Sequence, residues 1–258
     1  MVDIRELGVG HELVPYTKAL ALQRSTHAGV VAGEAGGTVL LLEHPSVYTA
    51  GRRTDPSERP DDGTPVIDVD RGGKITWHGP GQLVGYPIVR LPEPIDVVQY
   101  VRDLESVLIA VLADLGVDAR RVAGRSGAWV GEPGAEDKIA AIGIRVADGV
   151  AMHGFALNCS NSLDAYARIV ACGIRDAGVT TISRVVGREV TPAEALPFVE
   201  ERLAQLFERW VDDRAAAERL VSDRAAADRR VNDRVAARAT TAGAAVATAP
   251  VATAGVAA

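Results

Sequence analysis

Lysine, cysteine and long apolar runs are scarce in this sequence. Only three of its 28 basic residues are lysines, and only two of its 258 residues are cysteines. Two cysteines cannot form a disulfide framework, which favours a reducing compartment. No apolar run approaches the roughly 20 residues that span a bilayer, and no basic segment followed by an apolar one opens the chain. We therefore expect a cytoplasmic protein without a membrane partner.

The charge balance is acidic. The formal net charge is −6 and the pI is about 5.4, and the arginines are matched by acidic residues. A nucleic-acid-binding protein would usually carry a basic excess or stripe, so we expect no nucleic-acid partner. The five histidines lack the spacing of metal ligands, which predicts no metal site. They are His11, His27, His44, His78 and His153.

Apolar periodicity predicts both helices and strands. In the clearest helix, Asp96 is the expected N-cap and Gly116 follows the last turn. Helical spacing covers residues 14–23, 96–115 and 191–210. Short apolar or alternating runs predict strands over residues 38–43, 66–70, 83–91, 127–130, 138–146 and 150–158.

The order of these elements predicts the fold class. Ala147-Asp148-Gly149 joins the last two strands and has the chemistry of a tight hairpin turn. Helices and strands do not alternate regularly, which argues against a doubly wound parallel sheet. We predict an α+β fold with a mixed, largely antiparallel sheet and flanking helices.

The composition changes at residue 211. Units of about ten residues begin at Val211, Val221 and Val231, and residues 239–258 are almost only Ala, Thr, Val and Gly. Such segments have few large apolar side chains and cannot bury a core. We predict one globular domain over residues 1–210 and a tail over residues 211–258 that is helical at first and then disordered.

The most informative segment is Arg71–Gln82, which lies between two predicted strands. It contains four glycines together with Arg, Lys, Thr, Trp and His side chains. Glycines let the backbone approach a ligand closely, and clustered polar side chains on a loop indicate binding. The alternative is a decorated hairpin turn, since Gly-Gly and Gly-Pro are ordinary turn signals.

Two further residues are candidates for chemistry. Lys138 is one of the three lysines in an arginine-rich chain, and a lysine amine, unlike a guanidinium, can exchange its proton. Cys172 precedes Gly173, which would free the backbone to expose a nucleophilic sulfur. Cys159 lies on an apolar face and is interpreted as a packing residue. The spacing alone does not show that Lys138 and Cys172 meet.

Two histidines stay open at this point. His78 is either a base or hydrogen-bond donor of the site or a solvent-exposed turn histidine. His153 shares the apolar face of Cys159, and we expect a core histidine with satisfied hydrogen bonds.

Four segments together resemble the lipoyl(octanoyl) transferase family, that is, octanoyl-acyl carrier protein:protein N-octanoyltransferases. The resemblance covers roughly residues 1–205, and the set is far more specific than any one piece. It implies a domain like the catalytic domain of biotin and lipoate protein ligases, with residues 1–210 as the acyltransferase domain. The segments are Arg71–Gln82, Lys138–Gly143, His153–Asn158 and Cys172-Gly173-Ile174.

The resemblance also implies roles for individual residues. Cys172 would carry an octanoyl thioester, and Lys138 would depress the pKa of its thiol and act as general acid and base. Other residues would line the acyl-binding cavity. They are Arg71, Gly72, Gly73, Lys74, Ile75, Thr76, Trp77, His78, Ala141, Ile142, Gly143, Gly154, Phe155 and Ala156.

The implied reaction is a ping-pong acyl transfer that starts protein lipoylation. Octanoyl-acyl carrier protein would be the donor, and lipoyl domains of 2-oxoacid dehydrogenase E2 subunits and the glycine cleavage H protein would be the acceptors. No cofactor is implied, because the thioester is already activated, and we expect a monomer. Because such partners are acidic, we expect a local basic patch from Arg52, Arg53, Arg71 and Arg145.

Two other functions remain possible from the residues alone. An ATP-dependent lipoate or biotin protein ligase would need no nucleophilic cysteine. A non-catalytic module that only holds lipoyl domains or acyl carriers would be insensitive to loss of Cys172.

Overall fold

A computed structural model of the chain describes residues 2–60, 62–169, 173, 176–211, 213 and 219. Residues Met1–Trp210 cluster as one unit. Cys172 lies outside the described residues, and so does most of the tail beyond residue 211, including the segment predicted to be disordered. The domain division and the character of the tail therefore stay predictions.

The strands form two sheets. Within the described residues, an eight-stranded sheet has the order β1-β2-β6-β10-β9-β8-β7 with β11 beside β9, and a small sheet has the order β4-β3-β5. The strands are β1 (Asp3–Glu6), β2 (Thr38–Leu42), β3 (Val47–Ala50), β4 (Val66–Asp68), β5 (Thr76–His78), β6 (Gln82–Ile88), β7 (Arg120–Val122), β8 (Arg125–Val130), β9 (Asp137–Ala147), β10 (Val150–Asn158) and β11 (Gly178–Val179).

Most strand pairs are antiparallel, and the parallel pairs are β1–β2, β3–β4 and β9–β11. The predicted mixed, largely antiparallel sheet is therefore confirmed. At the predicted hairpin, Val150 pairs with Ala147, and Asp148 and Gly149 have φ angles of 52° and 74°. Positive φ at both central residues is what the twist of a two-residue hairpin requires.

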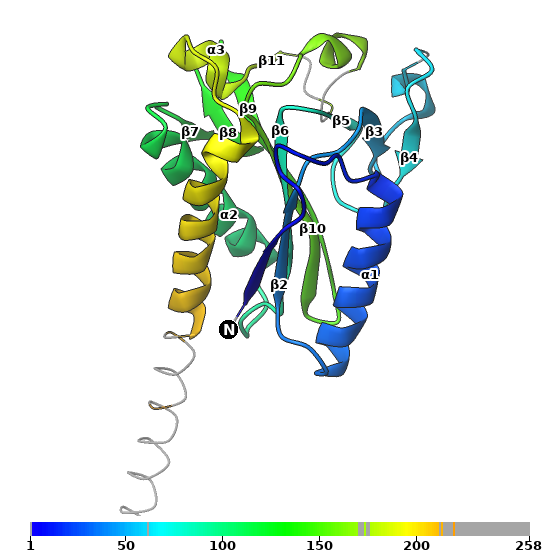
Figure 1. The fold of residues 1–258 in the computed structure, drawn as a ribbon, viewed down its shortest axis with the longest axis vertical. Coiled ribbons are helices and arrows are strands. Elements are labelled where there is room, and N and C mark those ends of the chain that lie inside the picture. The colour runs from blue at the N-terminus through cyan, green and yellow to red at the C-terminus, as the bar shows by residue number, and fades with distance from the viewer. Residues whose placement is uncertain are drawn as a thin grey trace, which may run out of the picture. The chain divides into compact units, whose positions relative to one another are not determined.

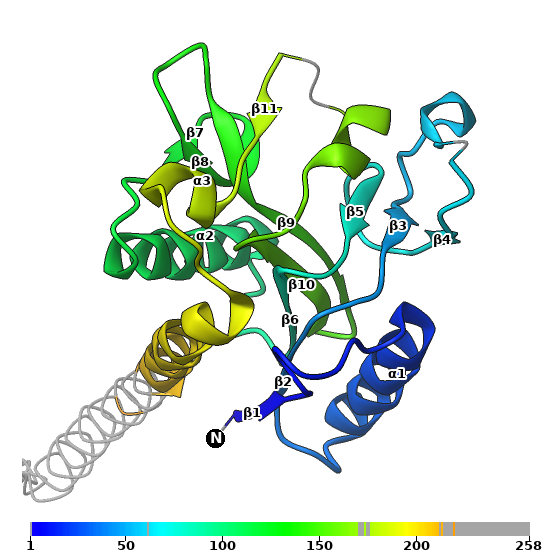
Figure 2. The ribbon, with the colours of Figure 1, turned by 45° about the horizontal axis from the view of Figure 1, so that its top comes forward.

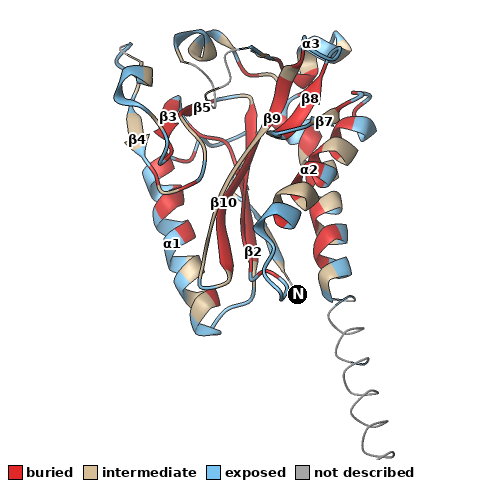
Figure 3. Ribbon diagram, turned by 180° about the vertical axis from the view of Figure 1, so that it is seen from behind, coloured by how far each residue is buried: buried red, intermediate tan, exposed pale blue. Residues whose placement is uncertain are grey.

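Helices cover both faces of the main sheet (Figures 1 and 2). Helix α1 (Tyr16–Ala32) packs on one face, and α2 (Val97–Asp114) with the helix over residues 192–211 packs on the other. The strands between them are largely buried (Figure 3). Shorter helical segments are η1 (Pro56–Glu58), η2 (Asp164–Arg168) and α3 (Ile182–Val186).

The predicted helix ends agree with the structure where capping residues mark them. Asp96 caps α2 by accepting a 2.8 Å hydrogen bond from the backbone N–H of Gln99, and Gly116 has a φ of 81°. Helix α1, however, extends beyond the predicted 14–23 to Ala32 and is followed by the C-cap residue Gly33, whose φ is 74°. Its last turns bury only Val30, so they lack the apolar stripe on which the prediction relied.

The small sheet holds the glycine-rich segment against the main sheet. Backbone N–H of Gly72 donates to the carbonyl of Ile144 on β9, at 2.9 Å. On its outer side, the small sheet has its own apolar cluster of Tyr48, Ile75 and Trp77. Its strands, like β1, β7 and β11, have two to four residues, too few to show a period in the sequence.

Candidate active site

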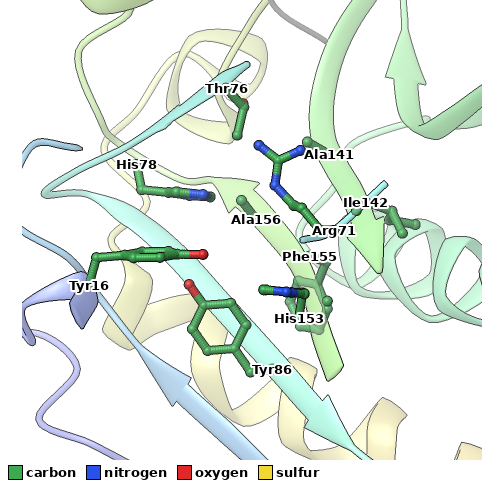
Figure 4. Close-up of a pocket in the computed structure, with 12 residues that line it drawn as sticks. Tyr16, Arg71, Thr76, His78, Tyr86, Ala141, Ile142, His153, Phe155 and Ala156 are labelled. Carbon is green, nitrogen blue, oxygen red and sulfur yellow. The ribbon is translucent and has the colours of Figure 1, made fainter. Parts of the chain in front are cut away.

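A pocket lies where the glycine-rich segment and the start of α1 meet the middle of β9 and β10 (Figure 4). About 400 Å³ of empty space lies within it, part of it open solvent. Its lining residues are Tyr16, Arg71, Thr76, His78, Tyr86, Ala141, Ile142, Gly143, His153, Gly154, Phe155 and Ala156.

Strand alternation decides which residues of the glycine-rich segment face the pocket. Thr76 and His78 line it, whereas Ile75 and Trp77 point into the apolar cluster of the small sheet. The Trp77 indole donates to the Ser46 hydroxyl at 2.9 Å, away from the pocket. The prediction of one continuous lining run is therefore wrong for Ile75 and Trp77, because neighbouring side chains in a strand point to opposite faces.

Gly72, Gly73 and Lys74 also lie outside the pocket lining. Lys74 forms an ion pair with Glu58. A Cβ added to Gly173 would lie 2.4 Å from Cδ of Lys74, and Gly173 has a φ of 76°. The residue that follows Cys172 in the chain therefore has a left-handed backbone conformation, which favours glycine.

Arg71 is a buried cation that lines the pocket and fixes the small sheet. Its guanidinium donates to the carbonyls of Gly72, Lys74 and Thr49 and to the Thr49 hydroxyl, at 2.7 to 2.9 Å. The side chain is only 7% exposed. Arg71 therefore cannot contribute to a surface patch, and that part of the predicted basic patch is wrong.

The opposite walls of the pocket come from two paired strands. In the β9–β10 register, Ala141 faces Ala156 and Gly143 faces Gly154. A Cβ on Gly154 would lie 2.1 Å from the carbonyl oxygen of Gly85, so only glycine permits the neighbouring strand to approach. Small residues on both strands leave space between the sheet and Arg71, which suits a slender apolar ligand.

Lys138 lies near the beginning of β9, outside the pocket lining. It is 6% exposed and is the cross-strand partner of Trp129, with Nζ 4.6 Å from the centre of the indole ring. A cation on the face of a buried aromatic ring is attracted by the ring quadrupole. Three residues, or about 10 Å of strand, separate Lys138 from the pocket wall at Ala141. Whether Lys138 meets Cys172 stays a prediction.

Cys159 has none of the properties of a nucleophile. It is fully buried, and burial raises the pKa of its thiol to about 12. It packs in the apolar cluster on the α2 side of the sheet. The interpretation of Cys159 as a packing residue is confirmed.

An aromatic cluster closes the α1 side of the pocket. It contains Tyr16, His44, His78 and Tyr86, with ring centres 5.1 to 6.1 Å apart. Burial lowers the pKa of His44 to about 4. Its Nδ1–H donates to the Val14 carbonyl at 2.6 Å, so Nε2 accepts from the Tyr86 hydroxyl at 2.7 Å. His44 is thus a neutral imidazole with a fixed tautomer, a residue that sequence reasoning had left uninterpreted.

His78 is also neutral and is not an exposed turn histidine. It is 7% exposed, and burial, assisted by the charges of His44 and Arg71, lowers its pKa to about 3. Its Nδ1 lies 2.8 Å from Oε1 of Gln82 and must carry the hydrogen, because an amide oxygen only accepts. His78 therefore lines the pocket as an uncharged imidazole at neutral pH, with the hydrogen of Nδ1 bonded to Gln82.

His153 is buried as predicted, but it is not a satisfied core histidine. It is 1% exposed and lines the pocket, with Nε2 2.8 Å from Oδ1 of Asp70. Asp70 in turn pairs with Arg145 at 2.8 Å. Among the described residues, Nδ1 of His153 has no hydrogen-bond partner. Of the residues predicted to form a basic patch, Arg145 is half-buried and paired with Asp70, whereas Arg52 and Arg53 are exposed.

Two searches cover only the described part of the chain. There, no group of three or more His, Cys, Asp or Glu side chains is placed to hold a metal ion. No helix in the same part is both long and apolar enough to cross a bilayer.

Comparison with known proteins shows the family to which this chain belongs. Residues 15–204 match the lipoyl protein ligase A/B catalytic domain. The chain is 66% identical over 211 residues to an octanoyltransferase of Clavibacter sepedonicus, covering 80% of this chain and 90% of that protein. It is 62% identical over 218 residues to an octanoyltransferase of Leifsonia xyli subsp. xyli, covering 84% of this chain and 97% of that protein.

Solved structures share the fold at low sequence identity. Lipoate-protein ligase A bound with ATP superposes with a TM-score of 0.61 at 15% identity, covering 80% of this chain and 85% of that one. A bipartite lipoate protein ligase from Thermoplasma acidophilum gives a TM-score of 0.60 at 14% identity, covering 80% and 83%. The predicted likeness to lipoate protein ligase catalytic domains is therefore confirmed.

Proposed function

Because this chain belongs to the lipoyl protein ligase A/B catalytic domain family and, within it, to the octanoyltransferases, we propose that it moves an octanoyl group from octanoyl-acyl carrier protein to a lysine of lipoyl domains through a thioester on Cys172. Family membership makes the protein an acyltransferase of protein lipoylation and confirms the resemblance seen in the sequence. The donor, the acceptor and the covalent intermediate belong to the proposal.

One observation carries the proposal most directly: strand β9 bears both a buried lysine and the wall of a narrow pocket. Lys138 is 6% exposed, while Lys18 is exposed and Lys74 is half-buried and paired. Burying an ammonium is costly unless it is paired or used. The small residues at Ala141 and Gly143 supply the slot in which an unbranched acyl chain would lie.

The choice of nucleophile follows from the two cysteines. With a pKa of about 12, the Cys159 thiol is protonated at neutral pH and buried in the core, so it cannot attack a thioester. Cys172 is the remaining thiol. A glycine with a φ of 76° follows it, a conformation that glycine adopts without strain.

The reaction consists of two balanced acyl transfers. Lys138 takes the proton of the Cys172 thiol, and the thiolate attacks the donor thioester carbonyl. The carrier thiolate leaves with the proton from the Lys138 ammonium. The acceptor lysine then attacks the acyl-enzyme, its proton passes to Lys138, and the Cys172 thiolate leaves and is reprotonated. The neutral pocket histidines take no part in these proton transfers.

The acceptors follow from the class of reaction. We propose lipoyl domains of 2-oxoacid dehydrogenase E2 subunits and the glycine cleavage H protein. Arg52 and Arg53, which remain exposed beside the glycine-rich segment, are the residues through which acidic partners would be oriented.

Intact-mass spectrometry of the protein mixed with octanoyl-acyl carrier protein, without ATP, tests the proposal. We expect an octanoyl adduct labile to hydroxylamine on the wild type and on Cys159→Ser, and none on Cys172→Ser. Lys138→Arg should form the adduct slowly. If transfer to a lipoyl domain required ATP and free octanoic acid, with no adduct on any variant, the protein would be a ligase instead.

A further inference from the structure

His153 lies in a conformation that its residue type rarely adopts. Its φ is 58°, one of two positive values among the described non-glycine residues, and it lies within β10 rather than in a turn. Strain of this kind persists only where the surrounding structure enforces it, and it gathers at functional sites. Here the backbone N–H of His153 is held by Oε1 of Gln23 on α1, at 3.0 Å.

The strained backbone redirects the side chain. Along β10, Ala151, Phe155 and Leu157 pack in the cluster on the α2 side, while Met152 and Ala156 pack in the cluster on the α1 side. Strict alternation would place His153 with the first group. Instead, its ring bonds to Asp70 and lines the pocket beside Tyr86, a residue of the α1-side cluster (Figure 4).

The hydrogen-bond partners of His153 determine which kind of group its unpaired nitrogen, Nδ1, can bind. Burial alone would raise the pKa of Asp70, but the hydrogen bond from His153 and the charge of Arg145 help to hold that pKa low. Asp70 is thus an ionised acceptor, and Nε2 of His153 carries the hydrogen. Burial lowers the pKa of His153, only partly offset by Asp70. Nδ1 is therefore a bare lone pair that requires a hydrogen-bond donor.

The position of His153 along the sheet relates it to the acyl chain. In the β9–β10 register, His153 pairs with Ile144, which is six residues, or about 20 Å, beyond Lys138. Ala141, paired with Ala156, lies halfway. Ala141 and His153 both line the pocket, so an acyl chain that enters from the Lys138 side approaches His153 as it lengthens.

We propose that His153 determines acyl-chain specificity at the far end of the pocket, by requiring an O–H donor at its Nδ1. A water molecule supplies that donor behind a short chain, or a terminal hydroxyl of the acyl group supplies it directly. An unsubstituted chain long enough to reach Nδ1 displaces the water and leaves a buried acceptor unpaired, which is disfavoured. The Tyr16 hydroxyl, which points into the same end of the pocket, can share the bound O–H group (Figure 4). This inference rests on the proposed acyl transfer.

The test compares unsubstituted acyl-acyl carrier proteins of six to twelve carbons with their terminally hydroxylated counterparts. For the wild-type enzyme, kcat/KM should fall at least about fivefold once the chain reaches Nδ1, and the hydroxylated chain of equal carbon number should recover that loss. The limiting length is the longest unsubstituted chain that keeps full kcat/KM. If the terminal hydroxyl raises kcat/KM only for chains longer than this, water is the usual donor to Nδ1. If it raises kcat/KM already at this length, the hydroxyl of the chain is the donor. Equal rates for both series at every length would overturn the proposal.

Two variants distinguish the effect of the Nδ1 acceptor from the effect of the strained backbone at His153. His153→Asn keeps a polar atom near the position of Nδ1 and tolerates a positive φ, so it should retain the preference for hydroxylated long chains. His153→Leu removes the acceptor and should abolish that preference and extend the limiting length. Retention of the preference in His153→Leu would contradict the proposal.

A binding measurement keeps the inference distinct from the proposed function. Calorimetric titration of the wild type with free decanoic and 10-hydroxydecanoic acids requires no transfer. Tighter binding of the hydroxy acid by at least about fivefold supports the role of His153 even if octanoyl transfer fails, and equal affinities refute it.

Discussion

Two buried polar clusters lie on opposite sides of the main sheet, and they differ in one respect. On the α2 side, Glu105 is fully buried and each of its oxygens is bonded: Oε2 accepts from Arg102 and Arg121 at 2.7 and 3.0 Å, and Oε1 from the N–H of Gly127 at 3.1 Å. On the pocket side, Asp70 and His153 are paired as well, yet Nδ1 of His153 has no partner among the described residues.

The difference separates a cluster that serves the fold from one that serves a ligand. A buried polar group whose bonds all go to the protein stabilises the folded chain and is otherwise inert. A buried polar atom left unpaired in a pocket reduces stability unless a bound group completes its hydrogen bonds. Substitutions on the α2 side should therefore change stability, and those on the pocket side should change catalysis.

The largest expected effect is on the rate of acyl transfer, and it comes from substitution of Lys138, the proposed acid and base. Lys138→Met should reduce the rate of octanoyl transfer by at least about 10³-fold, because proton transfer by a positioned group contributes about 10²–10⁴-fold. Lys18→Met, at an exposed position on α1, is the matched control and should retain full activity. Single-turnover transfer to a lipoyl domain measures both, and an equal loss in Lys18→Met would contradict the assignment.

Acid should weaken the pocket side first. His44 and His78 have pKa values lowered to about 4 and about 3, so below pH 6.5 the unfolded chain takes up protons that the folded chain refuses. The free energy of unfolding is unaffected well above pH 6.5 and should fall by on the order of 3 kcal/mol as the pH is lowered from 7 to 5.

Urea unfolding at a series of pH values measures this fall. His44→Gln removes one titrating group and should flatten the dependence by about half, while His11→Gln, at an exposed position, should leave it unchanged. An undiminished slope in His44→Gln would assign the acid sensitivity to other groups.

Glu105→Ala tests the polar cluster on the α2 side of the sheet. It leaves the Gly127 N–H and two arginines without their acceptor and should lower the free energy of unfolding by about 2 kcal/mol. Glu105→Gln keeps one acceptor oxygen and should lose less. In both variants kcat/KM at 25 °C should stay near the wild-type value. A large loss of activity at unchanged stability would show that the Glu105 cluster serves catalysis and not stability.

The smallest expected effect concerns Trp129, whose indole ring lies beside the Lys138 ammonium. Trp129→Leu removes the ring face beneath Lys138 and should reduce kcat about tenfold with little change in KM, since cation–π contacts at desolvated sites contribute about 2 kcal/mol. Trp129→Phe retains a ring and should recover most of the loss. If Leu and Phe were equivalent in steady-state assays, the ring face would have no positioning role.

Much of the candidate site could be predicted because its chemistry lies in short, unusual segments. Lys138 and the glycine-rich run were conspicuous against an arginine-rich background, and of the predicted cavity residues those on β9 and β10 all line the pocket. The errors came from strand alternation and from burial: Ile75 and Trp77 face away from the pocket, and Arg71 is buried and donates to Thr49. Neither property can be read from a contiguous motif.

The sequence by itself determined the α+β class, the capped helix after Asp96, the Asp-Gly hairpin and the family, because these depend on local periodicity, backbone preference and motif spacing. Only the tertiary structure decided that His44 and His78 are neutral and that His153 turns its Nδ1 into the pocket. The reason is physical: protonation and unpaired bonds depend on burial and on partners distant in the chain, such as Asp70 and Gln23, which no local pattern specifies.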